Sequence, residues 1–523
     1  MSDFFASPEK IQARETAYRA IETLKPEATS VVEYQSRGHV VIIANAQALL
    51  DFGDLPKDLS SEVVEYKGQT PNDDISISGA LGQFDVTIVN QKIKADLILD
   101  LSPSPLLTMG LKPPGYYSVD PSVPDFQKIK QEIKDELADM LGTFEKPKYF
   151  NYDASVCAHG RSGKSGCTRC IDACPAEAIT SLMDIINVDP TRCQGGGICA
   201  TVCPSGAITY AYPTPHDMLT HVRTLITTYL KQGETPPDLV FVTETEQTQA
   251  EQILPAALVI VVEEVASVGP EIWLSALAWG ARSVRIFDLG NAEGKNHIPP
   301  SSRDALDLYL EMTQTLLRAL NYPASAILVI HDANELITSK VMPIFELAKH
   351  AVLTKKREAF YMALDHLAAK SVDAKVLTSL PEGSIFGDVA VNKERCTLCM
   401  ACVSACPANA LQDSQEKPML SFVEANCLQC GICVNTCPED AMSISPRLLF
   451  DAQERRKPRL LNEEEPFCCI SCGKPFATWS GITTILSKLS GHAMFEDERA
   501  KNRLKMCDDC RVRDMMEDPA VDF

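Results

Sequence analysis

Residues 214–384 carry the most regular alternation of apolar and polar positions in the chain. Four short apolar runs predict strands, and four longer amphipathic stretches predict helices. The predicted strands are 238–243, 258–263, 284–288 and 327–331, and the predicted helices are 216–230, 270–278, 302–320 and 357–369. Because strands and helices alternate, we expect a parallel sheet covered by helices.

Residues 1–145 show a mixed pattern. Helices are predicted at 8–24 and 123–141. Strand-like runs lie between them, at 31–34, 39–43, 63–66, 84–89 and 96–101. This pattern predicts an α+β domain, and no catalytic signature accompanies it.

The predicted sheet of residues 214–384 has no dinucleotide-binding fingerprint. No G-x-G-x-x-G follows any of its strands, although flavin sites can lack that signature. Glu263, Glu264 and Asp288 fall at the ends of predicted strands. We interpret these acids as caps and solvated strand ends rather than as ligand-binding groups.

Charge and hydropathy exclude several classes of partner. The 523 residues include 49 basic and 70 acidic side chains, which gives a formal net charge of −21. A chain this acidic repels nucleic acid and anionic lipid surfaces. The apolar run at 253–262 is interrupted by Pro255 and is too short for a bilayer, which needs about 20 apolar residues. The first residues lack the features of a secretory leader, so we expect a cytoplasmic protein.

The 20 cysteines define the candidate chemistry. They form three groups, at 157–203, 396–437 and 468–510. In a reducing compartment, cysteines clustered at short spacing indicate metal ligation rather than disulfides. The first two groups are internal repeats of each other, and each half of each repeat ends in Cys-Pro.

The second group repeats the bacterial ferredoxin motif C-x2-C-x2-C-x3-C-P twice. In this motif the fourth cysteine ligates the other cluster. One [4Fe-4S] cluster is therefore predicted at Cys396, Cys399, Cys402 and Cys437, and another at Cys427, Cys430, Cys433 and Cys406. Two structural zinc sites are the disfavoured alternative.

The first half of the first group contains an insertion. Nine residues, rich in Gly and Ser, separate its first two cysteines, and we expect this loop to bulge outward without disturbing the ligands. His159 lies within the loop, where we favour a solvated side chain over an iron ligand. The predicted ligands of this [4Fe-4S] cluster are Cys157, Cys167, Cys170 and Cys203.

The second half of the first group lacks one cysteine, because Gly196 stands at the middle ligand position. Only Cys193, Cys199 and Cys174 remain for this cluster. Three thiolates suit a [3Fe-4S] cluster, or a fourth [4Fe-4S] cluster with one exchangeable iron. We favour a relay function over a substrate-binding iron, since no acid or base stands at a recognisable spacing.

The third group predicts a zinc-ribbon-like tail. Two C-x2-C pairs supply Cys469, Cys472, Cys507 and Cys510. A closed site of four thiolates favours zinc, with mononuclear iron as the alternative. Cys468 is left over, and His492 could replace one ligand. The tail is interpreted as a docking module or a stabilising clip.

The cysteine pattern resembles duplicated bacterial dicluster ferredoxins, or polyferredoxins. The segment from Val261 through Trp273 to Arg282 is similar to the delta subunit of methyl-viologen-reducing hydrogenases, without that family's own cysteines. The whole architecture resembles cytoplasmic 4Fe-4S proteins that accompany formate dehydrogenases. The resemblance implies an electron-transfer role beside a redox partner.

These observations predict a multidomain α+β and α/β protein in which two dicluster ferredoxin-like modules flank a parallel-sheet domain. The predicted domains are 1–145, 146–213, 214–384, 385–447 and 448–523. The central domain is expected to hold the two modules apart. We expect three [4Fe-4S] clusters, the three-cysteine cluster and a zinc ion.

The predicted function is the relay of single electrons between a cytoplasmic oxidoreductase, with formate dehydrogenase favoured, and another redox partner. A non-catalytic carrier or subunit is preferred to an enzyme. Two alternatives stay open. One is an electron-input subunit of a reductase with a catalytic three-cysteine cluster or a flavin, and the other is a maturation factor for a redox enzyme.

Overall fold

A computed structural model describes residues 7–26, 29–66, 75–88, 91–233, 235–290, 298–332, 335, 340–414, 416–489, 491–495 and 497–518. The chain divides into two compact units. The first unit comprises Met1–Ala154, Thr168–Leu182 and Ile186–Ser371. The second comprises Ser155–Cys167, Met183–Ile185 and Val372–Phe523.

The first unit contains the predicted parallel sheet of the central region. Its strand order is β17-β16-β18-β19, and every neighbouring pair is parallel. The strands are β16 (Asp238–Val242), β17 (Leu258–Val261), β18 (Ser283–Phe287) and β19 (Ile327–Ile330). The apolar runs form strands because most of their side chains are buried between helices.

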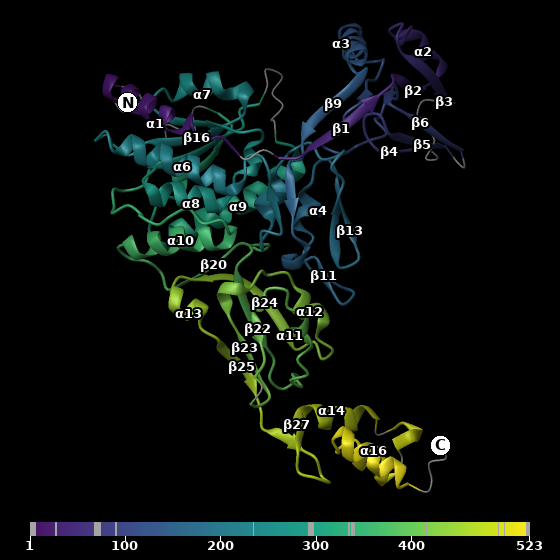
Figure 1. Cartoon of the computed structure of the whole chain (residues 1–523), viewed down its shortest axis with the longest axis vertical. Helices are drawn as coiled ribbons and strands as arrows, with labels where there is room; N and C mark the ends of the chain where they lie inside the picture. The colour runs from purple at the N-terminus through teal and green to yellow at the C-terminus, as the bar shows by residue number, and fades with distance from the viewer. Residues whose placement is uncertain are drawn as a thin grey trace. The chain divides into compact units, whose positions relative to one another are not determined.

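Helices pack around this sheet, as predicted. α8 (Pro270–Trp279) is buried along its whole length, which explains its apolar sequence. It packs between α6 (Pro215–Leu230) and α10 (Lys356–Lys370), and the three stack together in Figure 1. The other helices of this region are α7 (Gln247–Ile253), which the pattern did not predict, and α9 (Pro300–Ala319).

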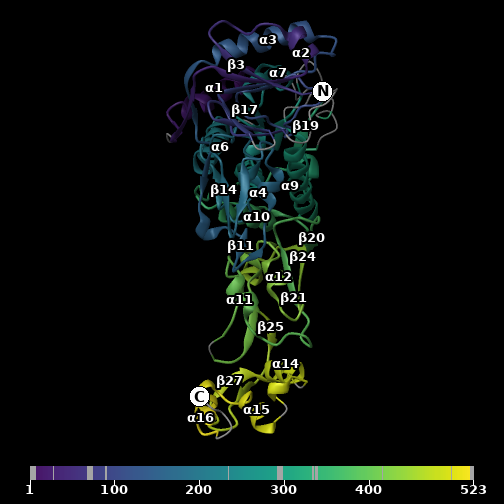
Figure 2. The same cartoon turned by 90° about the vertical axis from the view of Figure 1, so that its right-hand side faces the viewer.

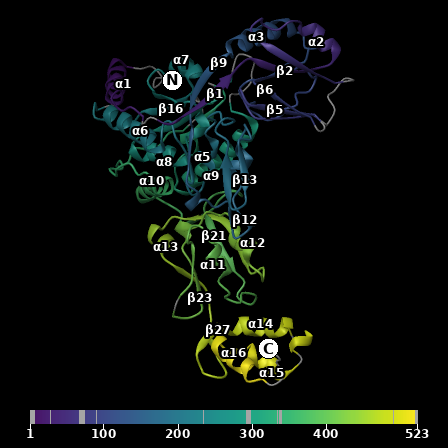
Figure 3. The same cartoon turned by 45° about the vertical axis from the view of Figure 1, so that its right-hand side comes forward.

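The N-terminal region contains a second parallel sheet, of order β3-β2-β7-β8. One face packs on α2 and α3, which are labelled with β3 at the top of Figure 2, and the other face packs on the antiparallel sheet β4-β5-β6 (Figure 3). Its elements are β2 (His39–Ala44), α2 (Ala46–Phe52), β3 (Ser60–Glu65), β4 (Ile75–Ser78), β5 (Phe84–Ile88), β6 (Gln91–Ala95), β7 (Leu97–Asp100), β8 (Tyr116–Ser118) and α3 (Phe126–Asp139).

The first helix packs on the central region rather than on the N-terminal sheet that follows it in the chain. α1 (Pro8–Ile21) lies against α6 of the central region, with Ala13 and Ala17 buried. The backbone N–H of Val259 donates to the hydroxyl of Tyr18 at 2.7 Å. The sequence grouped this helix with residues 1–145, but its small buried residues let it approach the central helix closely. β1 (Val31–Ser36) then pairs antiparallel with β9 (Gly142–Pro147).

The part of the first cysteine group that belongs to the first unit is built from short elements. α4 and α5 pack against each other, and β10 pairs antiparallel with β15. The elements are β10 (Phe150–Tyr152), α4 (Arg169–Ala173), β13 (Ile179–Leu182), β14 (Ile185–Val188), α5 (Ile198–Val202) and β15 (Ile208–Tyr210).

The second unit contains the second cysteine group between two antiparallel sheets, β20-β24-β21 and β22-β23-β25. Figure 3 shows α11 and α12 beside these strands. The elements are β20 (Leu377–Ser379), β21 (Gly387–Val391), α11 (Ala401–Ala405), β22 (Leu411–Gln412), β23 (Met419–Phe422), α12 (Ile432–Thr436), β24 (Met442–Leu449), α13 (Ala452–Arg456) and β25 (Arg459–Glu463). The sheets thus take strands from outside the predicted boundaries of 385 and 447.

The remainder of the second unit comprises the tail and one hairpin from the first cysteine group. The tail elements are β26 (Pro466–Cys468), β27 (Pro475–Thr478), α14 (Trp479–Leu489), α15 (Glu498–Arg503) and α16 (Asp508–Met516). The hairpin consists of β11 (Gly160–Arg161) and β12 (Lys164–Ser165).

Candidate metal centres

Two cavities of the second unit are lined by the cysteines of the second group. One cavity is lined by Cys396, Cys399, Cys402 and Cys437, among others. The other is lined by Cys406, Cys427, Cys430 and Cys433, among others. Each cavity therefore gathers the four thiols that the motif groups together, including the one from the opposite half.

The crossing follows from how two short helices pack. α11 and α12 contact each other, and Cys406 and Cys437 are the residues at which these helices end. Each is followed by a proline, which has no backbone N–H to donate to a continuing helix, so the helix ends at the cysteine. Each terminal thiol thereby reaches the cavity formed by the loop of the other helix.

Backbone amides support the thiols at both helix ends. The N–H of Ala410 donates to Sγ of Cys406, and the N–H of Ala441 donates to Sγ of Cys437, each at 3.3 Å. The loops around the other cysteines turn through left-handed residues, at Leu398, Met400, Gln429 and Gly431. Such turns direct successive N–H groups into one concavity and favour a negatively charged cluster.

Burial makes these thiols unfavourable as uncompensated anions. Burial and the charges of Cys396, Cys399 and Cys437 raise the pKa of the Cys402 thiol to about 12. Burial likewise raises the pKa of Cys430 to about 11. Four converging thiolates in such a cavity need a bound cation to offset their repulsion. The donor set and its surroundings therefore fit an iron–sulfur cluster.

A third cavity, in the first unit, contains the three-cysteine set. It is lined by Cys174, Cys193, Cys199 and Gly196, among others. A Cβ atom on Gly196 would lie 3.6 Å from Cγ of Pro175 and 3.7 Å from Cδ1 of Leu111. The corner at which the fourth thiolate is missing thus faces apolar side chains.

Leu111 comes from the N-terminal region, in which no motif indicates a role at this site. It lies in the loop between β7 and β8, and its N–H donates to the carbonyl of Pro175 at 2.8 Å. Arg192 Nη2 approaches Sδ of Met109 in the same loop at 3.8 Å. The first domain therefore covers one side of this site. No local motif could have revealed this, because the contact joins segments more than sixty residues apart.

Lys146 places a cation beside the three-cysteine set. Its amine donates to the carbonyls of Cys193 at 2.5 Å and Thr191 at 3.1 Å, and lies 4.9 Å from the centre of the Tyr34 ring. Burial lowers the pKa of the amine to about 8, so it is mostly protonated at neutral pH. A positive charge here favours an additional electron on the adjacent cluster.

Replacing Lys146 with methionine is expected to lower the midpoint potential of this cluster, because the more negative, reduced form loses the stabilising effect of a nearby cation. We expect a decrease of roughly 60 mV, which corresponds to about 1.4 kcal/mol for one electron. Redox titration followed by EPR spectroscopy measures it. Lys128→Met on α3 is the control, since Lys128 makes only an exposed pair with Glu132. Equal potentials in the two variants would rule out this electrostatic role.

The remaining predicted set is divided between the two units. Cys157 and Cys167 belong to the second unit, and Cys170 and Cys203 belong to the first. Their joint ligation of one cluster stays a prediction. His159 differs from the expectation of a solvated side chain: it is buried, and its Nδ1 lies 3.0 Å from the carbonyl oxygen of Cys167.

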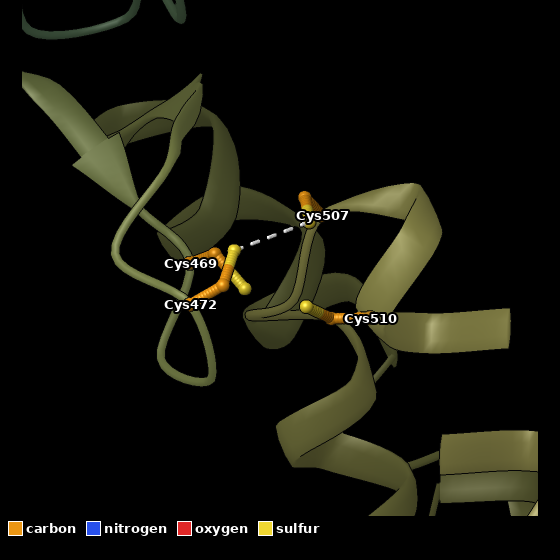
Figure 4. Close-up of side chains that lie close together, drawn as sticks. All are labelled: Cys469, Cys472, Cys507 and Cys510. Atoms are coloured by element: carbon orange, nitrogen blue, oxygen red, sulfur yellow. Dashed lines mark hydrogen bonds between the residues drawn. The ribbon is translucent and has the colours of Figure 1, made fainter. Parts of the chain in front are cut away.

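The four tail cysteines converge on one point (Figure 4). Their sulfur atoms all lie within 4.8 Å of one another, and those of Cys472 and Cys507 are 3.7 Å apart. Tetrahedral coordination at 2.3 Å places thiolates about 3.8 Å apart. Iron–sulfur cubes hold their thiolates farther apart, so this geometry fits a single metal ion.

Two elements position the tail cysteines. Cys469 and Cys472 lie in the turn between β26 and β27, whereas Cys507 and Cys510 lie at the start of α16. The helix N-terminus favours a thiolate there. Desolvation raises the pKa of the Cys469 thiol, but hydrogen bonds from the backbone of Cys507 and Cys472 outweigh this effect and lower the pKa to about 6. The alternative ligand His492 and the left-over Cys468 are both exposed and lie outside this group.

A cavity of about 670 Å³ lies beside the first cluster site of the second unit. Its lining includes the loop Thr397–Met400 and residues of α14. The hydroxyl of Thr478 donates to the carbonyl of Thr397 at 2.8 Å, and Lys488 pairs with Glu439 at 2.9 Å. The exposed Cys399 is part of this lining, so a docked partner could approach the cluster there.

The acids at the central sheet's strand ends behave differently from one another. Glu263 is exposed as expected, but Asp288 is fully buried beside Arg303 and His331, at 3.4 and 3.5 Å. The interpretation of Asp288 as a solvated end is therefore wrong. Burial, with the charges of Glu263 and Asp288, raises the pKa of Glu264 to about 7. The contacts of Asp288 with its basic neighbours fit a structural ion pair.

Comparison with known families identifies both cysteine repeats. Residues 395–442 match a family model of 4Fe-4S dicluster domains, and residues 165–207 match a second such model. The chain thus contains two 4Fe-4S dicluster ferredoxin domains, which imply several 4Fe-4S clusters and suggest iron–sulfur electron transfer. No curated protein matches the chain. Among the described helices, none is both long and apolar enough to cross a membrane.

Proposed function

We propose that this protein relays single electrons between redox proteins through four iron–sulfur clusters. The observation that carries the proposal is the grouping of cysteines around three cavities, each of which contains one predicted ligand set. When bound, the clusters supply reversible one-electron chemistry. The polypeptide would hold them by its thiolates, and backbone N–H groups donate to the sulfurs of Cys406 and Cys437. It forms and breaks no bond of a substrate.

The cluster at Cys396, Cys399, Cys402 and Cys437 is the proposed point of exchange with a partner. Cys399 is exposed, and the adjacent cavity offers a surface for a docked protein. The other two cavities are lined by buried and half-buried cysteines, which suits internal relay. Formate dehydrogenase is the partner that the family resemblance favours, with the cytoplasm as the compartment.

Anaerobic affinity purification from the native host tests the partner. We expect formate dehydrogenase to be recovered stoichiometrically and to reduce the purified chain when formate is added. The control is a chain with Cys399 replaced by alanine, which should still fold but accept electrons poorly. Recovery of immature enzyme and chaperones alone, with no reduction by the mature enzyme, would replace the relay by a maturation role.

The site that lacks a fourth cysteine is proposed to hold a [3Fe-4S] cluster. Its vacant corner faces Pro175 and Leu111, and neither side chain can ligate iron. Their side chains are apolar, so neither of them can orient a polar substrate at this corner. These contacts support a relay at this site rather than a substrate-binding iron.

Replacing Gly196 with cysteine is expected to convert this site to a [4Fe-4S] cluster. The added Cβ makes ordinary van der Waals contacts, and the position is not left-handed, so the side chain is accommodated without strain. The iron content should rise by about one per chain, and the EPR signal of the oxidised [3Fe-4S] cluster should disappear. Gly196→Ala, which adds the Cβ without a ligand, should retain that signal.

If the wild-type protein with full iron content shows no [3Fe-4S] signal after oxidation, the assignment is wrong. A [4Fe-4S] cluster with an exchangeable iron would then occupy the site. The iron gain in Gly196→Cys would in that case also be absent.

The tail is proposed to bind zinc. The close spacing of its four sulfurs and the sulfur-only donor set support this choice. Metal analysis of protein purified without added metal distinguishes zinc from mononuclear iron at this site. Mononuclear iron would also colour a chain from which the clusters have been removed.

A further inference from the structure

The insertion within the first cysteine motif forms an ordered hairpin. β11 and β12 pair through Gly160 with Ser165 and Arg161 with Lys164. At its base the N–H of Cys167 donates to the carbonyl of Ala158 at 2.8 Å. The buried His159 ring also contacts the Cys167 carbonyl, so the hairpin fixes the backbone of this predicted ligand. The loop is therefore more than a tolerated bulge.

One arm of the hairpin packs against α12, and both belong to the second unit. Nδ2 of Asn435 donates to the carbonyl of Ser165 at 2.9 Å. The approach at Gly166 is so close that a Cβ would lie 2.3 Å from Cγ1 of Ile432, which is fully buried. Only glycine fits at this contact.

This contact brings together residues from different predicted clusters. Gly166 precedes Cys167 directly, and consecutive Cα atoms are about 3.8 Å apart. Ile432 lies between Cys430 and Cys433 in the sequence. The neighbours of predicted ligands of the two clusters, Gly166 and Ile432, therefore pack directly against each other.

We propose that this hairpin is the electron bridge between the two dicluster domains. It holds the cluster ligated by Cys167 next to the cluster ligated by Cys430, so that an electron passes between the domains within one chain. In the step one cluster loses an electron and the other gains it, with no bond formed or broken. The proposal rests on the proposed relay function. It replaces the expectation that the central domain holds the modules apart.

Gly166→Val tests the bridge, because its side chain must push α12 away. We expect full iron content but loss of the magnetic interaction between the two clusters in the reduced protein, measured by pulsed EPR. Lys164→Ala is the matched control: this side chain is exposed on the same hairpin, and the interaction should persist. Asn435→Ala, at an exposed position of α12, should weaken the interaction.

If the Gly166→Val variant does not bind its clusters, a variant with a shortened loop provides a second test of the hairpin. Deleting residues 159–165 leaves Ala158 and Gly166 between Cys157 and Cys167, which restores the ordinary two-residue spacing. We expect this variant to bind its clusters but lose the interaction. An unchanged interaction in Asn435→Ala and in the shortened variant would overturn the bridge. Absence of reversible reduction in the wild type would instead refute the relay itself.

Discussion

Replacing Cys437 with alanine is expected to remove the cluster held by Cys396, Cys399 and Cys402, although Cys437 lies in the other motif. The structure places all four around one cavity. The expected loss is about four irons per chain, with the matching amount of labile sulfide. With only three thiolates left, one iron of the cluster would have no protein ligand. Because Cys399 is exposed, we expect the whole cluster to be lost.

Double substitutions identify which cluster is lost. Residues of one cluster act as a unit, so Cys399→Ala added to Cys437→Ala should remove no further iron. Cys430→Ala added to Cys437→Ala should remove about four more irons. The reverse pattern, in which Cys430 rather than Cys399 is redundant with Cys437, would show that each motif binds its own cluster. Cys406→Ala provides the mirror-image experiment.

Removing the tail metal is expected to unfold the tail. Among the described residues, the core beside the metal site consists of Cys469, Cys507 and Cys510 with Phe476 and Met506 packed against them, and Phe467 and Ile482 are further buried apolar side chains of the tail. The ion pairs of Arg499 and Arg503 with Asp514 are half-buried, at 3.1 and 2.6 Å, and we expect them to stabilise the tail less than the metal does. Binding of a structural zinc ion supplies about 10–16 kcal/mol in small domains, so the metal is the main source of stability here.

Hydrogen exchange measures this effect directly. After Cys507→Ala, or after chelation, the amides of α16 should exchange about a hundredfold faster or more. Protection in the sheets of residues 377–463 should be unchanged. Cys468→Ala is the matched control, because this thiol neighbours Cys469 but lies outside the group of converging sulfurs. Retained protection of α16 without metal would show that the tail folds by packing alone.

Elements whose formation depends on neighbouring residues could be predicted from the sequence. The four central strands and their helices follow directly from runs such as 238–243 and 258–263, since strand formation there depends on continuous burial. The cysteine sets of the cavities follow from spacing, because two residues between thiols fix how a loop can wrap one cluster. The periodicity missed short elements such as α2 and α7, which have too few turns to establish it.

Contacts between distant segments could not be predicted from the sequence. Nothing near Leu111 indicates that it covers the Gly196 corner, and nothing in α1 indicates that it packs on α6. The inserted hairpin was expected to be an outward bulge because Gly and Ser are common in flexible loops. Gly166 is instead required by its close approach to Ile432, a reason that becomes visible only in three dimensions.

The central claim is most directly tested by an anaerobic redox titration of the protein with full iron content, followed by EPR spectroscopy. The account predicts reversible one-electron reduction of clusters in both dicluster domains, within the range of about −700 to +450 mV that such clusters span. It also predicts an interaction between clusters of different domains once both are reduced. Irons that bind to the cysteines but show no reversible reduction in that range would contradict the relay function.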